Sequence, residues 1–414
     1  MSTDSGGPLH GIRVIDVGTR ISAPFCAGLL GELGADVIKV ELPGEGDFMR
    51  AMGPFVPVED GPDYSLSWSV EGRGRRGVTC DLRQPEGKDL FTRLVATADV
   101  LCENFRPGTM ERWGLGPDDL PRDLVYVRIS AFGQTGPYAP RPGLDRLGIA
   151  FGGLLNLTGE PARPPVRSGV NISDYLTGTF AAVAAVAALY GRDAVDSSGA
   201  GGPHRQGGQG EVIDAALYGS VLRILEWTLA GYDRLGIVRH REGNRLSTSA
   251  PLDNYPTAEG AYVCIVAGSD ANFRRLCAAM GRPELTQDPR FDTLAHRADH
   301  GDEINGIVSA WTSAISADEI TARCVEHDVP VGTAYNAADI FADAHMATRG
   351  DLVPIADPVI GPVRQQAPFP RLTKHPAGVP SGAPRLGEHN KEVWCGLVGL
   401  GEAELDDLTG RGVV

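Results

Sequence analysis

Residues 11–42 read GIRVIDVGTRISAPFCAGLLGELGADVIKVEL, and this stretch decides the fold class. The apolar runs IRVIDV and DVIKVEL are typical of buried strands. Between them APFCAGLLGELGA has the length of a helix, with Gly34 near its end. A strand, a helix and a strand joined by short links predict a right-handed parallel unit. We therefore expect a parallel sheet whose connections are helices.

The same alternation continues to residue 130. We expect further strands at GVTCDL (77–82), DVLCEN (99–104) and LVYVRIS (124–130), with a helix at 85–98 that Pro85 opens. Strands that alternate with helices favour an open sheet covered by helices on both faces. The predicted fold class is α/β, with a Rossmann-like large domain.

The middle of the chain changes character. Residues 192–210 are rich in glycine and polar residues and predict a flexible loop, whereas the apolar run 211–235 predicts one long helix. The segment from about 240 to 325 mixes strand and helix patterns and predicts a smaller α+β domain. The expected organisation is a large domain (1–210), a linking helix (211–239), a small domain (240–327), and a return to the large domain with a C-terminal tail (328–414).

Composition excludes several classes of partner. With 38 Lys and Arg against 53 Asp and Glu, the net charge is −15, which disfavours nucleic acid. The seven cysteines are scattered and the nine histidines show no metal-ligand spacing, so we expect neither a disulfide framework nor a metal site. Since no uncharged apolar stretch of membrane-spanning length and no leader pattern are seen, we expect no membrane association and a cytoplasmic location.

Common nucleotide motifs are missing. The first turn, DVGTRISAP, lacks the G-x-G-x-x-G glycines, although Glu41 resembles the ribose-binding acid of dinucleotide sites. There is also no P-loop and no G-x-S-x-G motif. An anionic ligand of an acidic protein therefore needs a local basic cluster.

Such a cluster is present in the sequence. Arg73, Arg75 and Arg76 precede one strand, and Arg106 follows another, where parallel sheets bind phosphate groups. The alternative is that these are solvated surface arginines.

Two further candidates remain open. The loop SAFGQTGPY (130–138) contains Gly133 and Gly136, whose backbone N–H groups are suited to an oxyanion, although an ordinary turn has the same composition. Asp174 precedes the apolar run 175–190 and is either the N-cap of a helix or a fixed nucleophilic carboxylate.

The motifs together carry a resemblance. The stretches that carry it are, in order, GELGADVIKVELPGEGD, ENFRPGTMERWGL, ISAFGQTGPYAPRPGLD, SDYLTGTFAAVAAVAAL and PRLGEHNKEV. From about residue 8 to 395 the sequence resembles the family III CoA-transferases. This family includes formyl-CoA transferase, carnitine CoA-transferase and the α-methylacyl-CoA racemases. The resemblance implies a Rossmann-like large domain built from both ends of the chain, a small domain and an intertwined homodimer.

The resemblance also implies roles for residues. Asp174 matches the family's nucleophile, with Gly178 matching the glycine that follows. Acyl-CoA and a carboxylic acid are the implied substrates, and no metal is required. For the oxyanion of this chemistry, the backbone N–H groups of Gly133 and Gly136 are our own candidate donors. The implied coenzyme A contacts are Lys39, Glu41, Arg73, Arg75, Arg76, Asn104, Arg106 and Asp145.

Departures from the racemase pattern favour a transferase. Leu144 stands where the racemases have an acid–base histidine, and Pro256 follows Tyr255 where they have a glutamate. The hypothesis is that CoA moves from an acyl-CoA to a free acid through an aspartyl anhydride and an aspartyl-CoA thioester. The alternatives are a 2-methylacyl-CoA racemase or epimerase, a non-catalytic CoA-ester-binding protein, and slow acyl-CoA hydrolysis.

Overall fold

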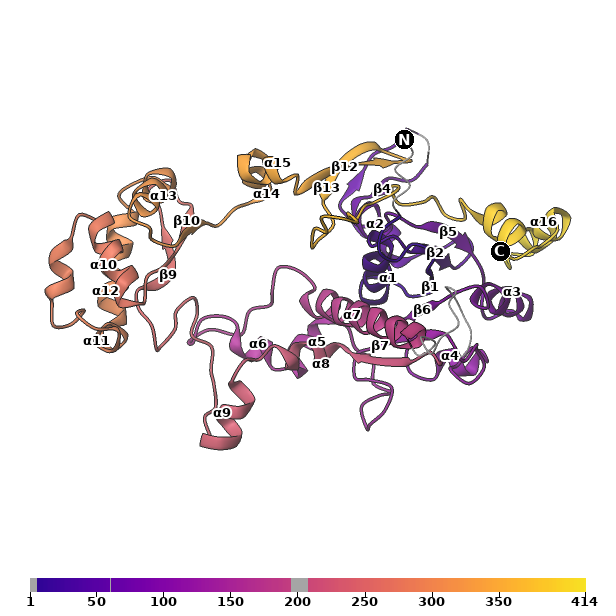
Figure 1. Cartoon of the computed structure of the whole chain (residues 1–414), viewed down its shortest axis with the longest axis horizontal. Helices are drawn as coiled ribbons and strands as arrows, with labels where there is room; N and C mark the ends of the chain where they lie inside the picture. Colours follow the sequence, from indigo (N-terminus) through magenta and orange to yellow (C-terminus); the bar gives the residue numbers. More distant parts are fainter. Residues whose placement is uncertain (1–5, 60, 195–207) are drawn as a thin grey trace. The chain divides into compact units, whose positions relative to one another are not determined.

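The computed structural model describes residues 6–59, 61–194 and 208–414. The chain forms two compact units, whose elements are labelled in Figure 1. The first unit contains Met1–Leu154, Ser168–Glu226 and Arg349–Val414, and the second contains Leu155–Arg167 and Trp227–Thr348.

The first unit is built on a parallel sheet, which has six strands within the described residues. The strands are β1 (Arg13–Asp16), β2 (Asp36–Glu41), β5 (Arg76–Thr79), β6 (Val100–Glu103), β7 (Val125–Ser130) and β8 (Val212–Ala216). Their order is β5-β2-β1-β6-β7-β8, with every neighbouring pair parallel. Numbered along the chain, this is the order 3-2-1-4-5-6 of dinucleotide-binding sheets. The strand order reverses between β1 and β6, where ligands of such sheets bind.

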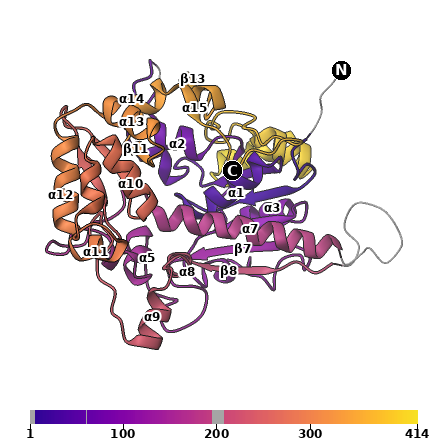
Figure 2. The ribbon, with the colours of Figure 1, turned by 60° about the vertical axis from the view of Figure 1, so that its left-hand side comes forward.

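Alternate side chains of the strands supply two separate cores. Val14, on β1, joins the helices α1 (Ser22–Glu32) and α7 (Ile172–Ala194) on one face, and these helices also pack against each other (Figure 2). The next residue, Ile15, joins the opposite core, which includes Phe91 of α3 (Pro85–Val95) and Leu408 of α16 (Glu402–Gly410). Successive side chains of a strand point to opposite faces of the sheet, so a sheet covered by helices on both faces has apolar residues at consecutive positions.

Helix α7 is a long helix of the first unit that packs against the sheet and α1. Its segment Ile172–Asp193 is long and apolar enough to cross a membrane by length and composition alone. Its residues Ala181, Ala185 and Leu189 are buried in the core shared with α1 and the sheet. A core helix of a globular unit has the same composition, and α7 packs as one.

The prediction of one long helix over 211–235 is wrong. Residues 212–216 form β8, which pairs with β7 as the edge strand, followed by α8 (Leu217–Arg223) and α9 (Thr228–Leu235). A short apolar run such as VIDAA has no period that separates a strand from a helix. The pairing of residues 212–216 with the edge of β7 makes this segment a strand. Of the predicted loop 192–210, residues 195–207 lie outside the described residues.

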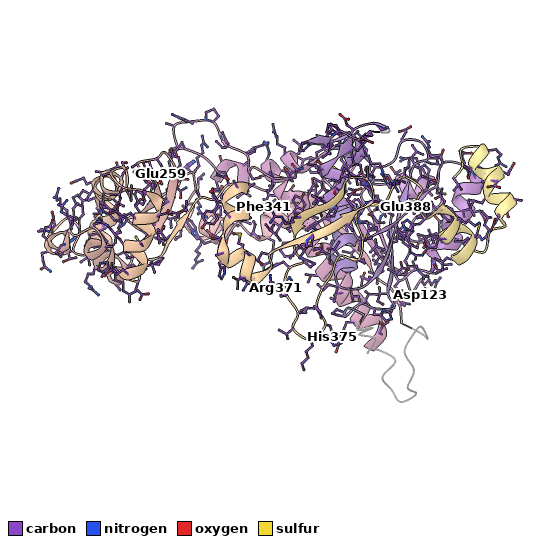
Figure 3. The ribbon with its side chains drawn as sticks, turned by 90° about the horizontal axis from the view of Figure 1, so that it is seen from above. Asp123, Glu259, Phe341, Arg371, His375 and Glu388 are labelled. Carbon is purple, nitrogen blue, oxygen red and sulfur yellow. The ribbon has the colours of Figure 1, made fainter. Side chains whose placement is uncertain are left out.

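The C-terminal segment returns to the first unit. β12 (Leu352–Asp357) and β13 (Gly361–Gln366) form a hairpin, and the chain then runs through His375 and Glu388 (Figure 3). Asp357 accepts hydrogen bonds from the hydroxyls of Tyr64, at 2.9 Å, and Ser69, at 2.7 Å. Both ends of the chain therefore build the unit that carries the parallel sheet.

The second unit is α+β. Its antiparallel sheet has the order β11-β10-β9 in the described chain, formed by β9 (Leu252–Pro256), β10 (Tyr262–Val266) and β11 (Val331–Thr333). Because β11 pairs with β10, residues 328–348 belong to this unit and not to the returning segment, so it is longer than the predicted 240–327. Its helices are α10 (Asp270–Ala279), α11 (Leu294–Asp299), α12 (Gly301–Thr312), α13 (Ala317–Glu326), α14 (Ala337–Ala342) and α15 (Ala344–Arg349).

The remaining elements are short. They are η1 (Phe48–Ala51), β3 (Phe55–Val56), β4 (Tyr64–Ser65), α2 (Leu66–Glu71), α4 (Thr109–Arg112), α5 (Asp145–Phe151), α6 (Leu154–Leu157), η2 (Pro283–Gln287) and the π-helical turn η3 (Lys391–Leu397).

Candidate active site

The loop after β1 is held in one conformation by the end of β6. Asn104 donates a hydrogen bond to the carbonyl of Thr19, at 2.7 Å, and accepts one from the Thr19 N–H, at 2.8 Å. Its amide also donates to the Ser22 hydroxyl, at 3.2 Å. Asn104, a predicted CoA contact, therefore lies at the switch point and fixes the shape of the loop that begins α1.

Beneath this loop lies a buried ion network. The ammonium of Lys39 is 2.9 Å from Asp47 and 3.4 Å from Asp16, and it donates to the Gly18 carbonyl. Arg75 donates to Asp16 at 2.6 Å and to the Pro24 carbonyl at 2.6 Å. Burial would lower the pKa of Lys39, but the carboxylates of Asp16 and Asp47 raise it above its ordinary value. Lys39 and Arg75 thus bind the protein's own acids.

Three more predicted contacts are also engaged by the protein itself. Arg73 pairs with Glu32 at 2.7 Å, Arg76 pairs with Asp36 and Glu392, and Glu41 pairs with Arg50 at 2.7 Å. These ion pairs join the edge strands to the helices and the C-terminal segment. The structure therefore gives these residues structural partners, and of the four predicted arginines Arg106 alone lines the cavity described next.

A cavity of about 840 Å³ opens beside the switch point. Asp174 and Ser22 contribute to its wall, together with the arginines Arg20, Arg106, Arg141 and Arg146. Among the described residues, no carboxylate forms an ion pair with any of these four arginines. A chain of net charge −15 thus contains a cavity whose cations are available to an anionic ligand.

Close packing of two helices brings Asp174 to this wall. A Cβ atom on Gly178 would lie 2.7 Å from the backbone oxygen of Ser22, so only glycine permits this approach of α7 to α1. Asp174 lies one turn earlier, in the first turn of α7. The approach at Gly178 therefore places the carboxylate of Asp174 near Ser22.

The helix start is capped by another residue. Asp145, the first residue of α5, accepts hydrogen bonds from the Ser173 N–H, at 2.8 Å, and the Ser173 hydroxyl, at 2.9 Å. The Asp174 N–H is 3.4 Å from the same oxygen. Asp174 is the third residue of the helix, so its carboxylate is not needed as the N-cap.

Asp174 has an unusual pKa. Burial and the negative charge of Asp145 raise it to about 7, against the lowering effects of Arg20 and a hydrogen bond with Ser22. A carboxyl group of this kind is protonated in part at neutral pH and gains a proton easily.

The predicted glycine loop does not reach this wall. Gly133 and Gly136 both have a φ of +87°, and the N–H between them, on Gln134, is bound by Asp214 at 3.0 Å. The cavity is lined instead by the start of this loop, at Ser130 and Ala131. The glycines shape the loop, and the residues that precede them face the ligand space.

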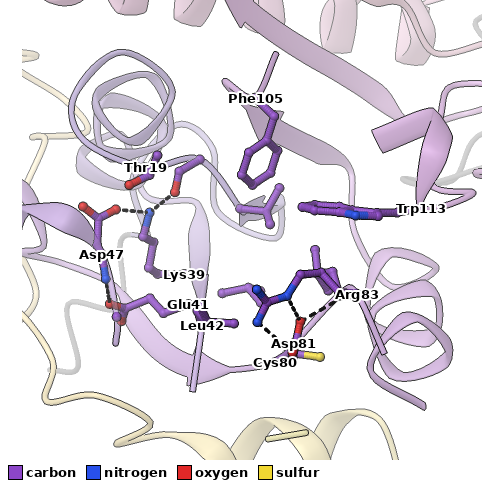
Figure 4. Close-up of a pocket in the computed structure, with 15 residues that line it drawn as sticks. Thr19, Lys39, Glu41, Leu42, Asp47, Cys80, Asp81, Arg83, Phe105 and Trp113 are labelled. Carbon is purple, nitrogen blue, oxygen red and sulfur yellow. Dashed lines mark hydrogen bonds and ion pairs between the residues drawn. The ribbon is translucent and has the colours of Figure 1, made fainter. Parts of the chain in front are cut away.

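A second cavity of about 320 Å³ adjoins the switch point (Figure 4). Phe105 and Trp113 form part of its wall, with their rings 5.3 Å apart, and Leu82 and Arg83 form another part. Thr19 and Phe105 line both cavities. The two cavities therefore share part of their walls.

No group of three or more His, Cys, Asp or Glu side chains within the described ranges is arranged to hold a metal ion.

Sequence reasoning missed three residues of the basic cavity. Arg20 follows β1, and Arg141 and Arg146 follow the glycine loop. The available signal for Arg20 was its position just after β1, whose carboxyl end lies at the switch point, whereas Arg141 and Arg146 lie well beyond the end of β7 and offered no such signal. The predicted cluster was chosen instead for its density of arginines, although local density does not reveal which acids pair with them.

Comparisons with known proteins identify the family. The model of CoA-transferase family III matches residues 9–390, so the chain belongs to this family. It is a CoA-transferase, as the relatives at this level of similarity are.

Two enzymes and one solved structure are similar to this chain over most of its length. The chain is 41% identical to succinyl-CoA–D-citramalate CoA-transferase of Chloroflexus aurantiacus over 98% of each chain. It is 34% identical to succinate–glutarate CoA-transferase of Agrobacterium fabrum, over 90% of this chain and 94% of that one. A solved structure, a CaiB/BaiF family protein from Brucella suis, matches with a TM-score of 0.82 and 32% identity, over 95% of this chain and 100% of that one.

Proposed function

We propose that this enzyme transfers CoA from succinyl-CoA, or a close dicarboxylic analogue, to a second dicarboxylic acid, with Asp174 as the covalent carrier. Relatives named for citramalate, malate and glutarate support this substrate class. The observation that carries the proposal is the position of Asp174 in a cavity lined by four arginines. Each substrate of such a reaction is an anion, and the cavity supplies the opposite charge.

Coenzyme A fits the two adjoining cavities. Its flat adenine suits the wall of Phe105 and Trp113, and its pantetheine arm would pass Thr19 and Phe105, which line both spaces. The thioester would then lie beside Asp174. In this arrangement Arg75 supports the loop that the arm passes, whereas Lys39 holds Asp16 and Asp47 and also lines the smaller cavity.

The chemistry proceeds by two exchanges at one carboxyl group. A carboxylate oxygen of Asp174 attacks the thioester carbonyl, the C–S bond breaks, and CoA leaves as the thiolate, forming a mixed anhydride. The thiolate attacks the aspartyl carbonyl of this anhydride, releasing the donor acid and leaving an aspartyl-CoA thioester. The acceptor carboxylate then attacks that thioester, and the same steps in reverse give the new acyl-CoA and free Asp174.

A carboxylate suits this role because the anhydride and the thioester both stay activated. An ester on a serine hydroxyl would be lower in energy and would stop the exchange. The oxyanion that forms in each attack needs a donor, and the Ser22 hydroxyl, which hydrogen-bonds Asp174, is a candidate. The arginines of the cavity also stabilise this charge.

We also propose a homodimer. The outer side of α7 exposes a row of apolar side chains, with Val183 63% and Tyr190 77% accessible in the isolated chain. Apolar surface of this kind favours coverage by another protein, and a second copy would provide it. Light scattering coupled to gel filtration should give twice the mass of 43.8 kDa. A monomer at micromolar concentration would contradict the dimer without affecting the role of Asp174.

The test of function replaces the carrier. Asp174→Ala should lower CoA transfer from succinyl-CoA to labelled malate, glutarate or citramalate by more than about 10³-fold. It should retain CoA affinity, measured by calorimetry. Asp406→Asn, an exposed acid on α16, is the control and should transfer as the wild type does. Transfer that survives in Asp174→Ala would exclude the mechanism.

A further inference from the structure

Arg20 has a backbone conformation that residues with side chains rarely adopt. Its φ is +67°, in the left-handed region that favours glycine. The loop imposes this conformation, because the N–H of Arg20 donates to Asp47 at 3.2 Å and the preceding Thr19 is clamped by Asn104. Strained backbone conformations are common at functional sites, where contacts with the surrounding structure offset their free-energy cost.

The guanidinium of Arg20 is held but not neutralised. It lies 3.6 Å over the ring of Phe48, and none of the acids in the described chain forms an ion pair with it. Stacking on an aromatic ring fixes the plane of the guanidinium and leaves its N–H groups free to bind a carboxylate. Arg20 lines the same cavity as Asp174, and its positive charge acts on that carboxyl group.

A dicarboxylic substrate brings a second carboxylate into the cavity beside Asp174, and this charge needs a cationic partner. When one carboxyl group reacts at Asp174, the other must lie in the same cavity, close to the acids Asp145 and Glu71, which act on Asp174 without lining the cavity themselves. An unpaired carboxylate there is strongly disfavoured, whereas the methyl end of a monocarboxylic acid has no such cost. Of the other arginines of the cavity, Arg141 is stacked on Tyr138, and Arg106 follows Phe105, which lines both cavities.

We propose that Arg20 binds the non-reacting carboxylate of the dicarboxylic substrate and so selects dicarboxylic over monocarboxylic acids. The inference rests on the proposed function, since it places the reacting carboxyl group at Asp174. Arg20 then serves both halves of the reaction, because the donor and the acceptor both present a second carboxylate in the same place.

The test compares two donors that differ at one end. Succinyl-CoA and butyryl-CoA have chains of equal length, ending in a carboxylate and a methyl group. Arg20→Gly should lower kcat/KM for succinyl-CoA by about 100-fold and leave that for butyryl-CoA within about threefold. Because glycine accepts the φ of +67° without strain, this variant should fold as well as the wild type, which a thermal melt checks.

Two matched variants complete the design. Arg20→Lys keeps the charge without the planar fork and should recover part of the preference for succinyl-CoA. Arg323→Gln, which removes an exposed arginine of α13, should leave both donors unchanged.

Equal losses for succinyl-CoA and butyryl-CoA in Arg20→Gly would overturn the role of Arg20 while leaving Asp174 intact. A wild type that moves no CoA, or an active Asp174→Ala, would instead overturn the proposed function. The two failures are therefore distinguishable.

Discussion

Two groups of cations lie around the switch point of the sheet, and they differ in what they face. Lys39 and Arg75 are buried and bound by Asp16 and Asp47. The arginines of the cavity, Arg20 among them, line open space beside Asp174, without an ion pair to any described residue. The first group fixes the loops, and the second remains available to an anion. The same residue type at nearby strand ends therefore has two different uses, and its partners decide which.

The largest expected effect concerns the buried group. Lys39→Met leaves the buried Asp47 without a cation and Asp16 with Arg75 alone, so we expect a loss of about 3–5 kcal/mol in the free energy of unfolding. Arg146→Gln, from the cavity, should change it by less than about 0.5 kcal/mol. Urea denaturation of both variants measures the difference. Equal free energies of unfolding for Lys39→Met and Arg146→Gln would mean that the buried cations do not stabilise the fold more than the cations of the cavity.

A second change tests how the cavity is held. In Gly178→Ala the new methyl group would lie 2.7 Å from the Ser22 backbone oxygen, so α7 must move away from α1. We expect a loss of about 1–3 kcal/mol in stability. CoA transfer should fall as well, because Asp174 moves with the helix. Gly191→Ala, on the same helix with open space around its Cβ position, is the matched control. Full activity in Gly178→Ala would show that the position of Asp174 is not set there.

The smallest expected effect is a shift in the pH dependence of kcat/KM when Asp145, the acid near Asp174, is replaced. Asp145 raises the pKa of Asp174, which lies at about 7. The carboxylate is the nucleophile, so kcat/KM should fall as the pH drops through this value. Asp145→Asn keeps a hydrogen-bond acceptor for Ser173 and removes the charge, so the acidic limb should shift to lower pH. A pH–rate profile that does not move would mean that another group controls the limb.

The sequence predicted much of the first unit for a clear physical reason. Apolar strands buried on both faces and helices of regular length give β1, β2, β5, β6 and β7 close to their observed bounds. The sixth strand, β8, was missed because its identity depends on pairing with β7, which is a tertiary interaction. The boundaries of the second unit depend on the pairing of β11 with β10 in the same way.

The site was predicted less completely than the fold. Asp174 was singled out as a carboxylate at a helix start, and its catalytic role stays a prediction. Arg75 and Arg76 were singled out as anion contacts, yet each lies against an acid distant in sequence, which no local pattern reveals. Arg20 was missed because its significance comes from a backbone angle and from the ring of Phe48.

The most direct test of the account is reductive trapping. Borohydride reduces an aspartyl thioester to the alcohol but leaves a free carboxylate unchanged. After incubation with succinyl-CoA and borohydride, the peptide that contains Asp174 should carry a hydroxymethyl group in place of the carboxyl group, and transfer activity should be lost in proportion. Without succinyl-CoA the peptide should be unmodified. An enzyme that transfers CoA normally yet shows no reduction at Asp174, or shows it at another acid, would contradict the central claim.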